Sequence, residues 1–233
     1  MINNQDGYTV IADQTLTDFL SEQVLQHIEV IAGVPLVNLQ HAFVVLRDEN
    51  DFSRVKSKAS RVFDKARATV TGDFIKVTTL GSIFGTEFKI SDEENIGYMN
   101  FYFRMVRSNS RSDVGGLHAD KWFWDLNNQK IPDNFERVKI WLPLIQDDKN
   151  PSLMIIPGSH RAPANYSYGF AEDSAGKRRP VIQESFDRSL VMPAPVRVGE
   201  YIAFDDQLIH GGCATQSDRV SVEFTILAPK NGY

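Results

Sequence analysis

The sequence predicts a mainly β protein in which α-helices flank an antiparallel barrel or sandwich. Apolar residues recur at helical spacing before about residue 70. From about residue 71, short β-rich runs alternate with turn residues such as Gly115-Gly116 and Pro157-Gly158. No linker divides the chain. We therefore expect residues 1–233 to form a single domain, with N-terminal helices over about 13–70 and a β core over about 71–230.

Two helices are predicted ahead of the β region. Residues 13–31 place Leu16, Leu20, Val24 and Ile28 on one apolar face. Residues 51–69 form the second predicted helix, whose outer face carries Arg54, Lys56, Lys58, Arg61, Lys65 and Arg67. We expect this basic face to be solvated, and a docking surface is the alternative interpretation.

Seven strands are predicted after the helices, at residues 74–79, 98–106, 138–144, 153–156, 189–198, 201–204 and 220–227. Between two of them, the polar segment 161–186 contains Gly, Pro and the basic cluster Lys177-Arg178-Arg179. A connection of this length predicts a lid or binding loop. Its basic cluster is either solvated or binds an anionic group.

Composition excludes several classes of function. The chain is 42% hydrophobic and 24% charged with a formal net charge of −5, values typical of a globular protein without a nucleic-acid or anionic-membrane partner. The single cysteine, Cys213, cannot form an intramolecular disulfide and is expected to be a small buried residue. Residues 1–8 lack a signal-peptide pattern, which favours a cytoplasmic location. The sequence leaves the oligomeric state open.

Three residues form a candidate metal site: His118, Asp120 and His210. His118 and Asp120 are two positions apart, and in an extended strand such residues point to the same face. His210 follows a later β-rich run. Two imidazoles and one carboxylate on one side of a metal leave the remaining coordination positions open, as iron(II) oxygenases require. His-X-Asp alone is a weak signal, and Arg219 and Ser221, which follow His210, strengthen the prediction.

A candidate carboxylate receptor follows the distal histidine. Arg219 and Ser221 are two positions apart at the start of the predicted strand 220–227. In an extended strand they therefore share one face. The guanidinium can bind a carboxylate through two hydrogen bonds, and the hydroxyl can donate a third. The alternative is a salt bridge between Arg219 and a nearby acid such as Glu223.

Residues 98–227 resemble the phytanoyl-CoA dioxygenase-like family of iron(II)/2-oxoglutarate-dependent oxygenases. Six blocks carry the resemblance in order: His-Ala-Asp at 118–120, Ile-Trp-Leu-Pro-Leu at 140–144, Leu-Met-Ile-Ile-Pro-Gly-Ser-His-Arg at 153–161, Gly-Glu-Tyr-Ile-Ala-Phe at 199–204, His-Gly-Gly at 210–212 and Arg-Val-Ser at 219–221. Their order and spacing together are specific. The resemblance implies a double-stranded β-helix, which is a jelly-roll, cupin-like barrel, with helices packed on one sheet.

The resemblance also implies a reaction. His118, Asp120 and His210 would bind Fe(II), Arg219 would hold the cosubstrate 2-oxoglutarate with help from Ser221, and O₂ would be the oxidant. The expected outcome is hydroxylation of an unactivated C–H bond of a small metabolite or biosynthetic intermediate, with release of succinate and CO₂. Desaturation or cyclisation stays open, whereas relatives that halogenate lack the carboxylate. His160 either orients the keto acid or braces the loop.

Substrate-binding candidates come from residues near the first metal motif. Tyr102, Arg104 and Arg107 lie on or beside the strand before His118, and Trp122 follows Asp120 by two positions. Surface ion pairs are the alternative for the two arginines, and core packing is the alternative for Trp122. We expect a small-molecule substrate.

Two other functions compete with the oxygenase. One is a cupin-like metalloenzyme that needs no keto acid, and the other is a non-catalytic jelly-roll protein that binds a small ligand. Arg219 and Ser221 argue against the first, and the intact set of metal ligands argues against the second.

Overall fold

Two antiparallel sheets face each other in the computed structural model, which describes residue 2 and residues 5–85, 87–126, 131–151, 153–172, 178–183 and 186–230. The larger sheet has the order β1 (Tyr8–Ala12), β9 (Glu200–Asp205), β4 (Phe135–Ile145), β11 (Arg219–Pro229) and β2 (Lys89–Ile90), with β3 (Tyr102–Val106) also paired to β11. The smaller sheet has the order β10 (His210–Gly212), β5 (Leu153–Ile155) and β8 (Met192–Pro193). A separate hairpin consists of β6 (Tyr168–Glu172) and β7 (Arg178–Ile182).

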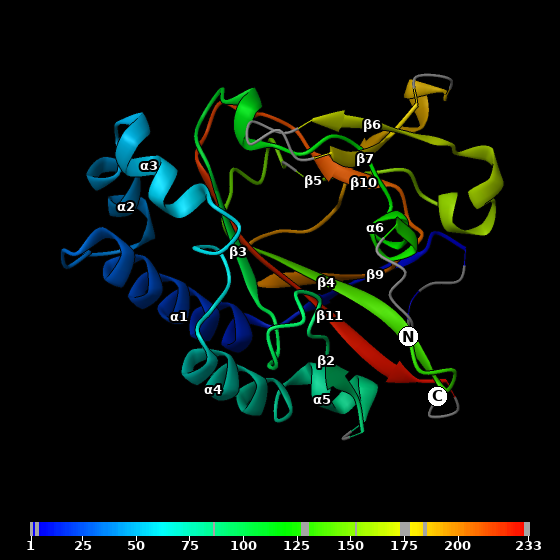
Figure 1. The fold of residues 1–233 in the computed structure, drawn as a ribbon, viewed down its shortest axis with the longest axis horizontal. Helices are drawn as coiled ribbons and strands as arrows, with labels where there is room; N and C mark the ends of the chain where they lie inside the picture. Colours follow the sequence, from blue (N-terminus) through cyan, green and yellow to red (C-terminus); the bar gives the residue numbers. More distant parts are fainter. Residues whose placement is uncertain are drawn as a thin grey trace.

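In the described parts of the chain, five helices cover one face of the larger sheet, and a sixth lies beyond its other face (Figure 1). The covering helices are α1 (Gln14–Ala32), α2 (Leu39–Val45), α3 (Glu49–Lys56), α4 (Lys65–Ile75) and α5 (Thr79–Phe84), and the sixth is α6 (Asp120–Leu126). Single 3-10 turns occur at Arg111–Asp113, Ser159–Arg161, Pro163–Asn165 and Arg188–Leu190. The predicted class, mainly β with flanking helices in a jelly-roll arrangement, is confirmed.

Alternation along the long strands explains this layering. Ile140 and Leu142 of β4 and Val222 and Phe224 of β11 point toward the helices and belong to the main hydrophobic core. Trp141 points the other way and packs in a second apolar cluster with residues of the smaller sheet. Lys139 of β4 and Glu223 of β11 also lie on this inner face. A mixed interior of this kind leaves room for a site between the two sheets.

The predicted helix over residues 51–69 is wrong in its middle. The chain leaves α3 at Ser57, and the segment at Val62 runs alongside β3, with a backbone hydrogen bond of 2.9 Å from Phe103 N to Arg61 O. A new helix begins after Asp64, whose side chain accepts a hydrogen bond from Arg67 N at 2.9 Å. Pairing with β3 and a strong capping residue therefore override the helical periodicity.

Three further differences concern element boundaries. Residues 74–79 are the end of α4, a turn and the start of α5, and not a strand, so the helices extend to Phe84. Residues 189–198 contain only the two-residue strand β8, because Pro193 and Pro195 cannot donate to a ladder. Strand β3 begins only at Tyr102. Conversely, β1, which precedes the helices, and the short helix α2 were not predicted.

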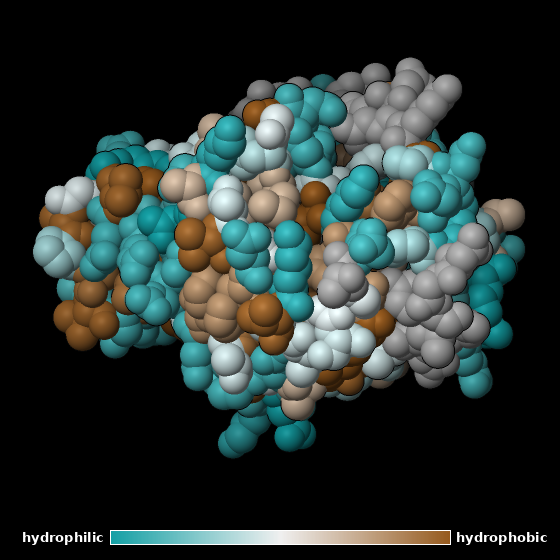
Figure 2. All heavy atoms as spheres, turned by 90° about the horizontal axis from the view of Figure 1, so that it is seen from below, coloured by the Kyte–Doolittle hydropathy of each residue, from teal (hydrophilic) through white to brown (hydrophobic). Residues whose placement is uncertain are grey.

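The face of the molecule on the side of α4 and α5 is largely hydrophilic, with separate hydrophobic patches (Figure 2). The exposed apolar side chains in the described parts of the chain include Val30, Val37, Val44 and Val77. Among the described residues, no helix has the length and apolar character that crossing a membrane requires.

The start of α1 generates a stability prediction. Asp13 accepts hydrogen bonds from Leu16 N at 2.9 Å and from the Thr79 hydroxyl at 2.6 Å, so it joins α1 to α5. We expect Asp13→Ala to lower the free energy of unfolding by about 2 kcal/mol, the sum of a lost cap and a lost hydrogen bond. Urea denaturation measures this change.

Asp48→Ala is the matched control, because Asp48 caps α3 through Asp51 N at 2.9 Å and is exposed. This variant should lose only about 1 kcal/mol. Equal losses in the two variants would show that the Asp13–Thr79 contact adds nothing to the stability of the fold.

Candidate metal centre

His118 and His210 lie side by side because their backbones pair. His118 N donates to His210 O at 2.8 Å, and His210 N donates to His118 O at 2.9 Å. This antiparallel bridge adds one pair to the edge of β10, the outer strand of the smaller sheet. The two imidazole rings consequently have their centroids 4.6 Å apart.

Both imidazoles are oriented by their own backbone. Nδ1 of His118 lies 2.8 Å from Gly116 O, and Nδ1 of His210 lies 2.9 Å from Leu208 O. A ring that donates its Nδ1–H to a carbonyl keeps a lone pair on Nε2. The structure therefore presents two Nε2 acceptors on the same side, which is the arrangement that metal-binding histidines use.

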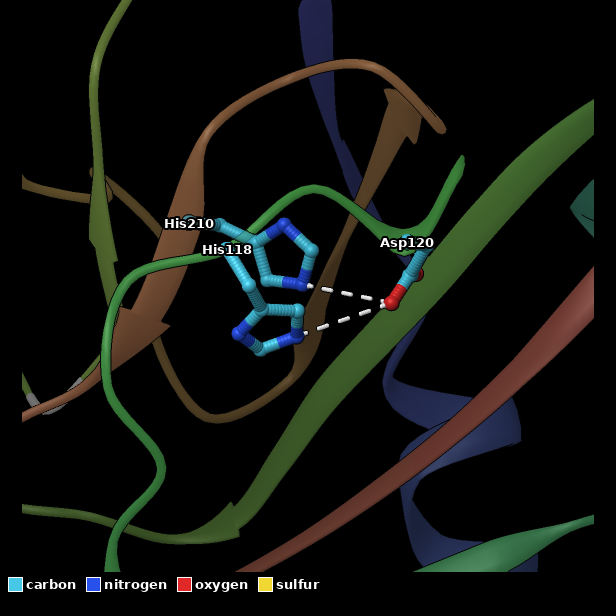
Figure 3. A group of neighbouring side chains, drawn as sticks. All are labelled: His118, Asp120 and His210. Atoms are coloured by element: carbon cyan, nitrogen blue, oxygen red, sulfur yellow. Dashed lines mark ion pairs between the residues drawn. The ribbon is translucent and has the colours of Figure 1, made fainter. Parts of the chain in front are cut away.

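Asp120 completes the group from a different element than predicted. It is the first residue of α6 and not part of a strand, so the argument from strand alternation is wrong. Its Oδ1 lies 3.7 Å from His118 Nε2 and 3.8 Å from His210 Nε2 (Figure 3). The three residues converge because the chain enters α6 directly after Ala119.

Electrostatics favour the ligating forms of Asp120 and His210. Burial opposes the charged Asp120 carboxylate, but Lys139, 3.6 Å from Oδ2, and the two histidines outweigh it and hold the pKa of Asp120 well below its usual range. Burial lowers the pKa of His210 to about 4, so this imidazole is neutral at pH 7. A neutral imidazole and an ionised carboxylate are the states that bind a metal.

The donor set fits a single divalent cation. One ligand atom from each residue lies within 4.8 Å of the others. Metal–ligand distances are about 2.0–2.2 Å, so one ion can reach all three atoms after small side-chain movements. Two imidazoles and one carboxylate with open positions are the ligands of non-haem iron(II) sites. The three ligands occupy one side and leave the other side open for further ligands.

Arg219 and Ser221 are both buried on the inner face of β11. The guanidinium carbon of Arg219 lies 5.9 Å from the centre of the Trp141 ring, which places it inside the barrel. Burial lowers the pKa of Arg219 to about 10, a value that still leaves it charged at pH 7. A buried cation beside a hydroxyl is suited to an anionic ligand.

A cavity of about 470 Å³ opens beside the metal ligands, and His118 and Asp120 form part of its wall. Its size is in the range of pockets that bind small molecules. Besides the two metal ligands, the polar side chains of the wall are Lys58, Arg61, Glu93, Glu94, Tyr102, Arg104, Lys139, Arg179 and Glu223. Apolar ones are Phe123, Trp124, Leu126, Phe170, Pro180 and Val181.

Of the four predicted substrate residues, Tyr102 and Arg104 line this cavity and the other two do not. Arg107 instead forms ion pairs with Asp113 at 2.9 Å and Glu49 at 2.5 Å, as the alternative interpretation proposed. Trp122 is buried and stacks on Tyr168 with ring centroids 5.0 Å apart.

The reason for the Trp122 error is the helix at Asp120. In a strand, residue 122 shares the face of residue 120, whereas in a helix the residues three and four positions on do so. Phe123 and Trp124 accordingly line the cavity in its place. The sequence of residues 120–126 gives no strong indication of a helix.

His160 lies in the 3-10 turn Ser159–Arg161, against the N-terminal segment. A Cβ atom added at Gly7 would lie 2.3 Å from His160 Nδ1, and Gly7 has a φ of +83°, so only glycine fits there. His160 is not among the residues that line the cavity. Ser159, its neighbour, accepts a hydrogen bond of 2.8 Å from Ile209 N and so fixes the residue before His210.

The predicted lid at 161–186 contains regular structure. Its hairpin β6–β7 contributes Phe170, Arg179, Pro180 and Val181 to the cavity wall. Arg178 lies in β7, and Lys177 of the predicted basic cluster lies outside the described residues. Whether the hairpin closes over a substrate stays a prediction.

Several residues of the cavity wall were not predicted from the sequence to belong to the site. Lys139 and Glu223 lie on long strands, where alternation with apolar neighbours signals an inward polar face. Arg61 was assigned to a solvated helix face. It instead lines the cavity, because its segment pairs with β3 at Val62. Glu93 and Glu94 follow β2, and the sequence gives no local signal for them.

The fold and the triad together define an iron(II)/2-oxoglutarate-dependent oxygenase. The family model of phytanoyl-CoA dioxygenase (PhyH) matches residues 4–221. The chain therefore belongs to the phytanoyl-CoA dioxygenase family, which confirms the predicted resemblance. No curated protein sequence is significantly similar to it.

Solved structures support the fold. EvdO2 from Micromonospora carbonacea var. aurantiaca, complexed with 2-oxoglutarate, is 13% identical with a TM-score of 0.52, covering 96% of this chain and 87% of EvdO2. EctD from S. alaskensis, with 2-oxoglutarate and 5-hydroxyectoine, is 16% identical with a TM-score of 0.55, covering 96% of this chain and 73% of EctD. EctD has also been crystallised with bound Fe.

Metal binding can be measured directly. We expect His210→Ala to weaken the binding of Fe(II) at least roughly a hundredfold, since it removes one of three protein ligands. Calorimetry under nitrogen measures the dissociation constant. His41→Ala is the control, because His41 lies in α2 and contacts Val37 N at 3.2 Å, away from the triad. Equal affinities in these two variants would contradict the proposed ligand set.

Glu223 generates a pH prediction. Burial raises its pKa, but Lys139 and Arg104 outweigh burial and hold the pKa at about 2. A free glutamate has a pKa of about 4.3, so the stabilisation from Glu223 is present above pH ~4.3 and is lost as the pH falls toward about 2. We expect Glu223→Gln to lower the free energy of unfolding at pH 7 by on the order of 2 kcal/mol.

The difference between wild type and Glu223→Gln should shrink as the pH falls from about 4.3 to 3. Urea denaturation at several pH values between 3 and 7 measures it. Glu22→Gln, at an exposed position of α1, should leave the curve of the wild type almost unchanged. A difference that grows with acidity would contradict the ion-pair assignment.

Proposed function

We propose that this protein hydroxylates an unactivated C–H bond of a small metabolite or biosynthetic intermediate, using iron(II), 2-oxoglutarate and O₂. The observation that carries the proposal is the convergence of His118, Asp120 and His210 beside a cavity of about 470 Å³. Two of the ligands line that cavity, so a substrate bound there lies next to the metal. When bound, iron(II) couples the oxidative decarboxylation of 2-oxoglutarate to the oxidation of the substrate.

The protein side chains supply position and charge. Arg219 and Ser221, both buried, would bind the distal carboxylate of 2-oxoglutarate from the inner face of β11. The polar contacts of the two histidine Nδ1 atoms fix the direction of the ligand atoms. The apolar part of the cavity wall excludes water from the reacting carbon.

Asp120 supports hydroxylation over halogenation. A carboxylate at the third ligand position occupies the place that a halide would need. Lys139, which has Nζ 3.6 Å from Asp120 Oδ2, stabilises this carboxylate as an anion and limits its movement. Lys139 therefore acts as a positioning residue for the metal ligand and not as a reacting group.

Two readouts test the proposal. Succinate formation from 2-oxoglutarate, screened over a library of small metabolites with iron(II) and O₂, should be abolished in His118→Ala and His210→Ala. In addition, Arg219→Ala should weaken the binding of 2-oxoglutarate to the iron-loaded protein under nitrogen by roughly tenfold to a hundredfold, because a charge-assisted hydrogen bond is lost. Calorimetry gives this change without turnover.

Arg197→Ala is the matched control, since Arg197 is exposed and does not line the cavity. This variant should bind 2-oxoglutarate as the wild type does. If Arg219→Ala also binds normally, a metalloenzyme that needs no keto acid becomes the better explanation. If neither iron nor 2-oxoglutarate binds to the wild type, a non-catalytic ligand-binding protein is favoured.

A further inference from the structure

Three arginines from three separate segments meet on the cavity wall. Arg61 lies between α3 and α4, Arg104 lies on β3, and Arg179 lies on β7 of the hairpin. Arg61 is placed there by the backbone hydrogen bond from Phe103 N to Arg61 O at 2.9 Å. The three cations therefore share a small space although they are far apart in the sequence.

Arg61 has spare capacity for hydrogen bonds. Its Nε is buried and has no hydrogen-bond partner among the described residues. Burial lowers the pKa of Arg61 to about 10; the positive charges of Arg104 and Arg179 act in the same direction, and the negative charge of Glu223 opposes them. Like charges gathered in a partly buried place repel one another, and an anion between them would remove that cost.

The carboxylates on the wall are already engaged. Glu94 pairs with Lys58 at 2.5 Å and accepts a hydrogen bond of 2.6 Å from the Tyr102 hydroxyl. Glu93 lies 3.9 Å from Lys139 and also accepts a hydrogen bond from the Thr225 hydroxyl.

Glu223 lies 3.6 Å from Arg104, and Lys139 also stabilises its charge. The acidic side chains of the wall are thus satisfied by protein groups, whereas the guanidinium of Arg61 retains donors for a ligand. Among the described residues, the wall carries five basic and four acidic side chains, and one of the acidic ones is the metal ligand Asp120.

Apolar side chains from two elements also line the cavity. Phe123, Trp124 and Leu126 come from α6, and Phe170, Pro180 and Val181 come from the hairpin. Trp124 is held in place by Arg137, whose guanidinium carbon lies 3.9 Å from the centre of its ring. A ligand that fills this cavity has a polar, negatively charged end and an apolar body.

We propose that Arg61, Arg104 and Arg179 bind the carboxylate or phosphate of an amphiphilic substrate whose apolar body lies against α6 and the β6–β7 hairpin. The inference rests on the proposed function and names the substrate class of the same site. The group bound here is distinct from the distal carboxylate of 2-oxoglutarate, because Arg219 does not line this cavity. The apolar body then lies on the side of His118 and Asp120, where oxidation takes place.

The test measures binding without turnover. Protein loaded with iron(II) and 2-oxoglutarate under nitrogen is titrated in a calorimeter with 3-phenylpropionate, octanoate and 3-phenylpropyl phosphate. Each probe is compared with a neutral analogue: 3-phenylpropanamide, octanamide and 3-phenylpropanol. We expect at least one anion to bind more tightly than its neutral analogue, and the comparison of carboxylates with the phosphate decides which anion the site takes.

Arg61→Gln should weaken the binding of the preferred anion by roughly tenfold or more and leave its neutral analogue unchanged, because charge-assisted hydrogen bonds are lost. Arg179→Gln, on the hairpin, is a second variant that should act in the same direction. Arg197→Gln is the control, since it removes an exposed arginine outside the cavity. Circular dichroism confirms the fold of each variant.

The binding of 2-oxoglutarate separates this inference from the proposed function. If 2-oxoglutarate binds normally but no probe is preferred over its neutral analogue, the anion site is overturned and the oxygenase proposal stands. The same conclusion follows if Arg61→Gln and Arg179→Gln both bind the preferred anion as the wild type does. If 2-oxoglutarate itself fails to bind to the wild type, the proposed function fails, and the substrate site with it.

Discussion

The pair of backbone hydrogen bonds between His118 and His210 is the constraint on which the rest of the site depends. It joins two segments that are distant in sequence and sets their imidazoles 4.6 Å apart. Ser159 supports the second segment by accepting a hydrogen bond from Ile209 N. Because the backbones pair, the imidazoles remain free to bind a metal. The position of the two histidines is therefore set by strand pairing and does not depend on contacts between their side chains.

Polar side chains can lie inside the barrel because the two faces of the larger sheet differ in composition. The outer face of β4 and β11 is apolar and packs against the helices, so it supplies the main hydrophobic stabilisation. The inner face can then carry Lys139 and Glu223, which compensate each other's burial. Burial lowers the pKa of Lys139, but Asp120 and the nearby glutamates outweigh it and raise that pKa above its usual range. Removing one of these charged side chains would leave the others buried without a compensating charge.

Much of the architecture was predictable, and the errors have local causes. The long strands around Ile140 and Phe224 were predicted because their apolar pattern is strong. The helix over residues 51–69 was predicted from an equally clear pattern, yet pairing with β3 interrupts it and turns Arg61 into the cavity. The assumption of a strand at Asp120 selected Trp122, whereas the helix that begins there presents Phe123 and Trp124. The periodicity of a short segment gives no information about a distant segment that competes to pair with it.

The sequence by itself determined the layered class of the fold, the family and the three residues proposed to bind iron, because residue types, their order and their spacing carry that information. Only the tertiary structure decided which side chains surround the reacting space. Arg61, Arg104 and Arg179 come from three segments with no common motif, and Glu93 and Glu94 come from a fourth. Their meeting depends on strand pairing and helix packing between distant parts of the chain, and a linear pattern of residues does not encode those contacts locally.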